Sequence, residues 1–141
     1  MSWSFTVPGQ PITTNHAYIT GKMPVKRGGR PVFNEDMTQK MIHRPILTDD
    51  ARSWRDAVEV IARLACPPKY VQQVEGLQLR VLIDLRVAND VDADGTLKLV
   101  LDGIKRGIGI DDRWFLPCVR SKQVGRRLNE ACVIVTIEEV R

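Results

Sequence analysis

The clearest pattern in the sequence is an apolar residue at every second position between residues 77 and 87, with mostly polar residues between them. The apolar positions are Leu77, Leu79, Val81, Ile83, Leu85 and Val87. A period of two predicts a β-strand with one buried face, and the residues between them, Asp84 among them, belong to the other face. Shorter alternations predict strands at residues 3–7 and 131–137 and indicate a further strand near 118–124.

Two other segments have helical periodicity. Between residues 54 and 65 the apolar side chains recur at the spacing of one buried helical face, after Thr48, which is a favourable N-cap. A second helix is predicted over residues 95–106, with Asp94 as its N-cap and Gly107 near its end. This order of elements predicts an α+β fold: a single mixed β-sheet with helices packed against it, in one domain spanning residues 1–141.

The segment between the first strand and the first helix has no sustained period. Residues 19–47 are interrupted by glycines and prolines and are rich in lysine and arginine. We expect a long basic loop here, with a short strand near residues 31–33. Loops of this length in a compact domain are usually functional or disordered, and both alternatives are open.

Composition excludes several classes of protein. With 43% hydrophobic and 27% charged residues the chain is typical of a globular protein. It has neither an apolar run long enough to span a membrane nor a recognisable secretory signal, and its three cysteines are widely spaced. We therefore expect a cytoplasmic protein with no membrane partner.

Charge is unevenly distributed along the chain. Residues 98–127 contain eight basic and three acidic side chains, directly after an acidic cluster of Asp90, Asp92 and Asp94. Carboxylates that hold a metal, next to a basic surface that attracts a polyanion, are typical of enzymes that act on phosphodiesters. A solvated surface with no ligand is the alternative.

Asp92 and Asp94 are the first candidates for metal ligands. Mg²⁺ and Mn²⁺ prefer a few carboxylates together with water and substrate phosphate. An isolated Asp-x-Asp is also compatible with a turn residue followed by a helix cap. Lys98 and Asp102 follow Asp94 at helical spacing, so Lys98 either forms surface ion pairs or reaches the phosphate that the aspartates would hold.

These residues together resemble a known family. The run from Asp92 and Asp94 through Lys98 to Asp102, followed by Asp111-Asp112, resembles the D-x-D-N-x-x-K-x-x-x-D pattern and later acidic pair of the RusA family of Holliday junction resolvases. Pro8, Pro11 and Asn15 are similar to the opening of that family. Gly95 departs from the pattern because the family has asparagine there, which removes a side chain able to orient a carboxylate.

The resemblance implies a small homodimeric endonuclease of a kind often carried by phages and prophages. Such enzymes use Mg²⁺, or Mn²⁺ in its place, to make paired nicks in four-way junction DNA. Carried over by position, Asp92, Asp94 and Asp112 would bind the metal and Lys98 would be the catalytic lysine. A relative that binds junctions without cutting them is the alternative.

Other basic and polar residues are candidates for contacts with DNA. We expect Asn15, Lys98, Arg113, Arg120 and Lys122 to bind the substrate, mainly through backbone phosphates. His16 either approaches the DNA beside Asn15 or is an ordinary loop residue.

The position of Asp112 raises a geometric question. Asp94 and Asp112 lie at opposite ends of the second predicted helix, which is roughly 18 Å long. We expect residues 107–112 to bring Asp112 back to the same site within one chain. The alternative is that Asp111 or Asp112 reaches the site of the partner subunit.

Overall fold

The computed structural model describes residues 2–68 and 77–140 and has the predicted α+β architecture. Four strands form one mixed sheet in the order β1-β8-β6-β7. The antiparallel pairs are β1 (Ser2–Pro8) with β8 (Cys132–Glu139) and β8 with β6 (Leu79–Val87), whereas β7 (Phe115–Val124) runs parallel to β6. The chain passes from β6 to β7 through a helix, which is the usual connection between parallel strands.

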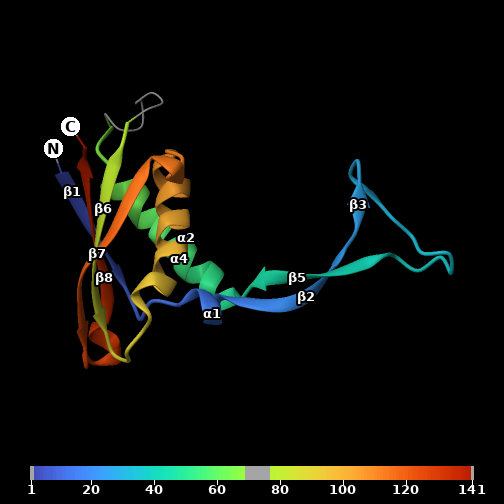
Figure 1. The fold of residues 1–141 in the computed structure, drawn as a ribbon, viewed down its shortest axis with the longest axis horizontal. Helices are drawn as coiled ribbons and strands as arrows, with labels where there is room; N and C mark the ends of the chain where they lie inside the picture. The colour runs from blue at the N-terminus through green and yellow to red at the C-terminus, as the bar shows by residue number, and fades with distance from the viewer. Residues whose placement is uncertain (1, 69–76, 141) are drawn as a thin grey trace.

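The predicted buried face of β6 is confirmed. Leu79, Val81, Ile83, Leu85 and Val87 are all fully buried. Helices α2 (Asp49–Ala65) and α4 (Ala93–Ile108) lie side by side on one side of the sheet, as Figure 1 shows. The hydrophobic core therefore lies between these two helices and one face of the sheet.

Helix α2 matches its prediction closely. Thr48 is the N-cap and its hydroxyl accepts a hydrogen bond from the Ala51 amide at 3.2 Å. Trp54, Val58 and Ala62 are buried, as the helical periodicity predicts. The capping hydroxyl fixes where this helix starts, because it satisfies an amide that the first turn leaves without a partner.

Helix α4 is longer at both ends than predicted. Asp92, not Asp94, is its N-cap, and the helix ends at the left-handed Gly109 (φ 75°) instead of near Gly107. Gly107 lies inside the helix, and it is a glycine because a side chain there would collide with α2. A Cβ at this position would lie 2.5 Å from the Glu59 carbonyl oxygen. The glycine thus allows close packing of the two helices, and the prediction that the helix ends near it is wrong.

Residues 18–47 are the main difference from the sequence prediction. Instead of a loop they form a β-ribbon, here called the arm, in which β2 (Tyr18–Pro24) pairs antiparallel with β5 (Met41–Leu47). A shorter hairpin of β3 (Lys26–Arg27) and β4 (Arg30–Pro31) continues it. A two-stranded ribbon buries neither face fully and tolerates proline at its edges, so it produces no alternation in the sequence.

The arm projects away from the body of the molecule. Figure 1 shows it leaving from beside the short helix α1 (Thr14–Ala17), at the end of the body where α4 begins. Two short 3₁₀ segments complete the described elements: η1 (Asp112–Trp114), before β7, and η2 (Leu128–Glu130), before β8. None of the helices in these described ranges combines the length and the apolar character needed to cross a bilayer.

Candidate functional site

Asp92 and Asp94 lie together at the start of α4. Asp92 is in extended conformation (φ −66°, ψ 116°), and its Oδ1 accepts a hydrogen bond from the Asp94 amide at 3.2 Å. Asp94 lies in the first turn, and both residues are exposed. The partial positive charge at a helix N-terminus stabilises carboxylates in this position.

A second segment, distant in sequence, lies beside Asp92. A pocket of about 310 Å³, here called the acidic pocket, is lined by Pro11, Ile12, Thr13, Asn15, His16, Asp90, Val91 and Asp92. The Thr14 hydroxyl holds the two segments together by donating to the Gly95 carbonyl at 2.9 Å. Asn15, which is expected beside the DNA, and His16, for which both alternatives are open, thus share a pocket with Asp92.

The imidazole of His16 has a defined orientation. Its Nδ1 lies 3.0 Å from the hydroxyl oxygen of Thr13, a buried residue. Either atom can donate, depending on the tautomer. This contact turns the other ring nitrogen, Nε2, away from Thr13, and Nε2 makes no hydrogen bond with the described residues.

The structure gives a steric reason for Gly95. A Cβ at this position would lie 3.3 Å from the Thr13 Cβ and 3.6 Å from the Asp92 Cβ. A side chain at this position, including the asparagine of the RusA pattern, would therefore require Thr13 to shift by a few tenths of an ångström. Gly95 allows the two walls of the acidic pocket to approach each other.

A glutamine that the sequence analysis missed fixes the loop before the aspartates. Gln10 Nε2 donates to the Asn89 carbonyl at 3.0 Å, and its Oε1 accepts from the Ala88 amide at 2.8 Å. A side-chain amide that bonds to a backbone nearly eighty residues away leaves no local sequence signal. Gln10 ties the end of β1 to the segment that carries Asp90 and Asp92.

Lys122 lies next to this pocket. Its ammonium group donates to Asp90 Oδ1 at 2.8 Å and to the Val91 carbonyl at 3.2 Å. The hydrogen bond from Lys122 lowers the pKa of Asp90 below its ordinary value. Lys122 therefore links β7 to the acidic loop, and a phosphate in the pocket would compete with Asp90 for this cation.

Arg120 has an internal partner. Its guanidinium hydrogen-bonds to both carboxylate oxygens of Asp84, with Nε 3.2 Å from Oδ1. Asp84 is only 5% exposed, and the hydrogen bond from Arg120 lowers its pKa. Contact between Arg120 and DNA remains a prediction. Arg120 would contact DNA either while it is paired with Asp84 or after it has released Asp84.

Asp112 does not join Asp92 and Asp94 within one chain. Its Oδ1 accepts a hydrogen bond from Lys105 Nζ at 3.2 Å, in the last turn of α4. The helix rise of about 1.5 Å per residue puts Lys105 roughly 16 Å from Asp94 along the axis. The expected return of Asp112 within one chain is therefore wrong, because Lys105 and the short η1 turn hold it at the far end of the helix.

Asp111 stays at the same end of α4. Its Oδ1 accepts a hydrogen bond from the Arg113 amide at 3.0 Å, which lowers its pKa. In the described residues, no three His, Cys, Asp or Glu side chains lie close enough together to hold a metal ion.

Lys98 and Arg113 are accessible to a ligand. Lys98 is 53% exposed and lies 3.7 Å from Asp102, toward the C-terminal end of α4. This surface pair is weak, so Lys98 can exchange Asp102 for another anion. Arg113 lies over the ring of Trp114, with 5.5 Å from its guanidinium carbon to the ring centroid, near Asp112 and not near the acidic pocket.

No protein-family model matches the chain, and no curated protein matches it. The acidic pocket and its neighbours therefore carry the functional argument.

Proposed function

We propose that this chain is a metal-dependent endonuclease that resolves four-way DNA junctions by paired nicks, acting as a homodimer in the cytoplasm. The observation that supports it best is the meeting of Asn15 and His16 with Asp92 in the acidic pocket, at the N-terminus of α4. Asp92 of the Asp-x-Asp thus lies near Asn15, which belongs to the segment that resembles the opening of the RusA family. The three cysteines are all free, as is usual in a reducing compartment.

The donor set at the start of α4 fits a hard divalent cation that also binds the substrate. Mg²⁺ is typically held by one or two carboxylates together with water and phosphate oxygens, and two exposed carboxylates are what Asp92 and Asp94 offer. Mn²⁺ has the same preference for oxygen ligands. A bound ion would supply a more acidic water and would neutralise charge on the phosphate.

The chain's own residues would bind and orient the DNA around that site. Asn15 offers an amide to a phosphate or sugar oxygen, and His16 offers its free Nε2. Lys98, one turn into α4, would place its ammonium group on the phosphate whose negative charge increases during cleavage. Lys122 would also bind this phosphate, after its ammonium group releases Asp90.

A homodimer gives Asp112 a role that one chain does not. Asp112 of one subunit would complete the site formed by Asp92 and Asp94 of the other, and a two-fold dimer would present two such sites to the two symmetric strands of a junction. Mixing Asp92→Asn and Asp112→Asn subunits tests this arrangement. A shared site predicts that the mixed dimer regains one intact centre, whereas a site within one chain predicts that it stays inactive.

A second candidate function is junction binding without cleavage. It is favoured because, among the described residues, no three His, Cys, Asp or Glu side chains are grouped closely enough to hold a metal ion. Incubation with a synthetic four-way junction, with and without Mg²⁺, separates the two functions. Symmetric nicks that require the metal support the nuclease, and a gel shift with no product in Mg²⁺ or Mn²⁺ supports the binder.

A further inference from the structure

The arm carries the entire net positive charge of the protein. Residues 18–47 contain six basic and two acidic side chains, a net charge of +4, whereas the rest of the chain contains fifteen of each. All six cations are exposed. They are Lys22, Lys26, Arg27, Arg30, Lys40 and Arg44.

These cations have no internal partner, in contrast to most cations in the described part of the body. Within the described residues, none of the six forms an ion pair or a side-chain hydrogen bond. In the described part of the body, by contrast, nine cations are ion-paired: Arg52, Arg55, Arg63, Arg80, Lys98, Lys105, Arg106, Arg120 and Lys122. The acidic residues of the arm do not compensate, because Asp36 accepts hydrogen bonds from Thr38 and Glu35 pairs with none of the six.

Two of the arm's cations are placed directly opposite each other. Arg27 pairs with Arg30 across the β3–β4 hairpin, whose turn is Gly28-Gly29 with positive φ at both residues. Like charges at facing positions destabilise a β-ladder. A bound anion would remove this repulsion.

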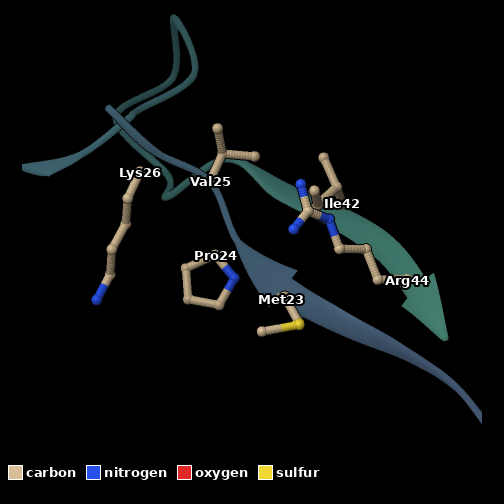
Figure 2. Close-up of a pocket in the computed structure, with 6 residues that line it drawn as sticks. All are labelled: Met23, Pro24, Val25, Lys26, Ile42 and Arg44. Carbon is tan, nitrogen blue, oxygen red and sulfur yellow. The ribbon is translucent and has the colours of Figure 1, made fainter. Parts of the chain in front are cut away.

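The root of the hairpin combines apolar surface with positive charge. A shallow pocket of about 320 Å³ is lined by Met23, Pro24, Val25, Lys26, Ile42 and Arg44. Figure 2 shows the Arg44 guanidinium next to Ile42, and Lys26 extending away from the ribbon. An apolar floor flanked by two cations suits a sugar-phosphate backbone, because the sugar packs on carbon while the phosphates meet the charges.

We propose that the arm is a duplex-binding element that lies along one double-stranded branch of the substrate and directs it into the acidic pocket. The major groove, about 12 Å wide, admits a two-stranded ribbon. The seven paired positions of β2 and β5 extend for about 20 Å, roughly two-thirds of a helical turn of DNA.

Continuity of the chain links the arm to the site. His16 lines the acidic pocket and β2 begins at Tyr18, so a duplex held by the arm would be held next to Asp92. This assignment rests on the proposed function, because the nuclease identifies the polyanion as DNA. Binding along the backbone would be independent of sequence.

The test compares two double variants with the same net charge. Arg27→Gln with Arg30→Gln removes two arm cations, and Arg52→Gln with Arg63→Gln removes two exposed cations of the body. Binding of the full chain to a fluorescent 30-base-pair duplex is measured in EDTA across a salt series, so that cleavage plays no part. Circular dichroism checks folding. The arm variant should fold, because replacing the two facing arginines removes a charge repulsion.

We expect the arm variant to lose between about tenfold and a hundredfold in affinity at 0.1 M salt, and its salt slope to fall by about two. The body variant should change less than threefold. Equal losses in the two variants, or no duplex binding by the wild type at low salt, would overturn the assignment. An unchanged affinity in the arm variant, together with an Ile19→Ser variant that turns a dimer into a monomer, would make the arm a protein interface instead.

The proposed nuclease function fails separately. A wild type that never cuts junctions, but whose duplex binding depends on Arg27 and Arg30, would remove the nuclease and keep the arm as a DNA-binding element. If the wild type cuts junctions but the arm substitutions leave duplex binding unaffected, the nuclease function stands and the assignment of the arm as a DNA-binding element fails.

Discussion

Arg120 and Asp84 form a two-point ion pair on the face of the sheet that the helices do not cover. The pair coincides with a β-bulge: Ile83 is opposite Val119 and Asp84 is opposite Ser121, so Arg120 is the extra residue. The Ser121 hydroxyl adds a hydrogen bond to Asp84 Oδ1 at 2.6 Å. The irregularity therefore brings two donors from β7 to one buried carboxylate of β6.

This pair makes part of the stability dependent on pH. Arg120 lowers the folded-state pKa of Asp84 below the ordinary value of 3.8. The stabilisation is therefore present above that value and is lost as the pH falls through the lower folded-state pKa. We expect Asp84→Asn to lose about 1–3 kcal/mol of unfolding free energy at pH 7. Urea unfolding at pH 7 and near pH 3 should show the difference from wild type shrinking in acid. A difference that stays constant would contradict the ion pair.

Close packing of α2 against α4 gives a second prediction. A Cβ at Gly103 would lie 2.6 Å from the Val58 Cβ, and one at Gly107 would lie 2.5 Å from the Glu59 carbonyl oxygen. Alanine is the better helix former by about 1 kcal/mol, but overpacking costs about 1–3 kcal/mol. We expect Gly103→Ala and Gly107→Ala each to lower the thermal midpoint, measured by calorimetry. Neither contact can be relieved by a side-chain rotation, because the Val58 Cβ and the Glu59 carbonyl oxygen move only with the backbone of α2. A raised midpoint in either variant would show that the helices are further apart.

Gln10 gives a third prediction, which concerns the geometry of the site. Gln10→Ala removes two hydrogen bonds to the backbone of residues 88–89 and should cost about 1–2 kcal/mol. Because the freed loop carries Asp90 and Asp92, we expect kcat for junction cleavage to fall while the affinity for the junction stays close to wild type. The control is Gln78→Ala, since the Gln78 side chain is exposed and makes no hydrogen bond with the described residues. Equal activity in the two variants would show that Gln10 has no positioning role.

The sequence patterns predicted what depends on local periodicity. They located α2, the buried face of β6 and the closing strand because burial imposes periods of 3.6 and 2 on those segments. Asp92 and Asp94 were likewise placed correctly at the strand-to-helix junction. The sequence patterns could not predict the arm, because its ribbon is open to solvent on both faces and its sequence has no period.

Long-range contacts were also beyond local patterns. The bonds of Gln10 to residues 88–89 and of Arg120 to Asp84 join segments that are distant in sequence. Asp112 was misplaced for a related reason: its ion pair with Lys105 holds it at the C-terminal end of α4, and no spacing rule shows which carboxylate a lysine selects. The sequence pattern predicts a helix end near Gly107 because it does not show the second helix against which this glycine packs.

The central claim is that Asp92 acts in metal-dependent cleavage, and junction cleavage by Asp92→Asn tests it most directly. Asparagine is an equally good N-cap, so the start of α4 should be preserved. The control is Asp50→Asn, an exposed carboxylate in the first turn of α2. With Mg²⁺ and an end-labelled four-way junction, we predict paired nicks from wild type and Asp50→Asn. Asp92→Asn should cleave at least about a hundredfold more slowly, with unchanged junction binding. Full cleavage by Asp92→Asn, or no cleavage by wild type in Mg²⁺ or Mn²⁺, would contradict the account.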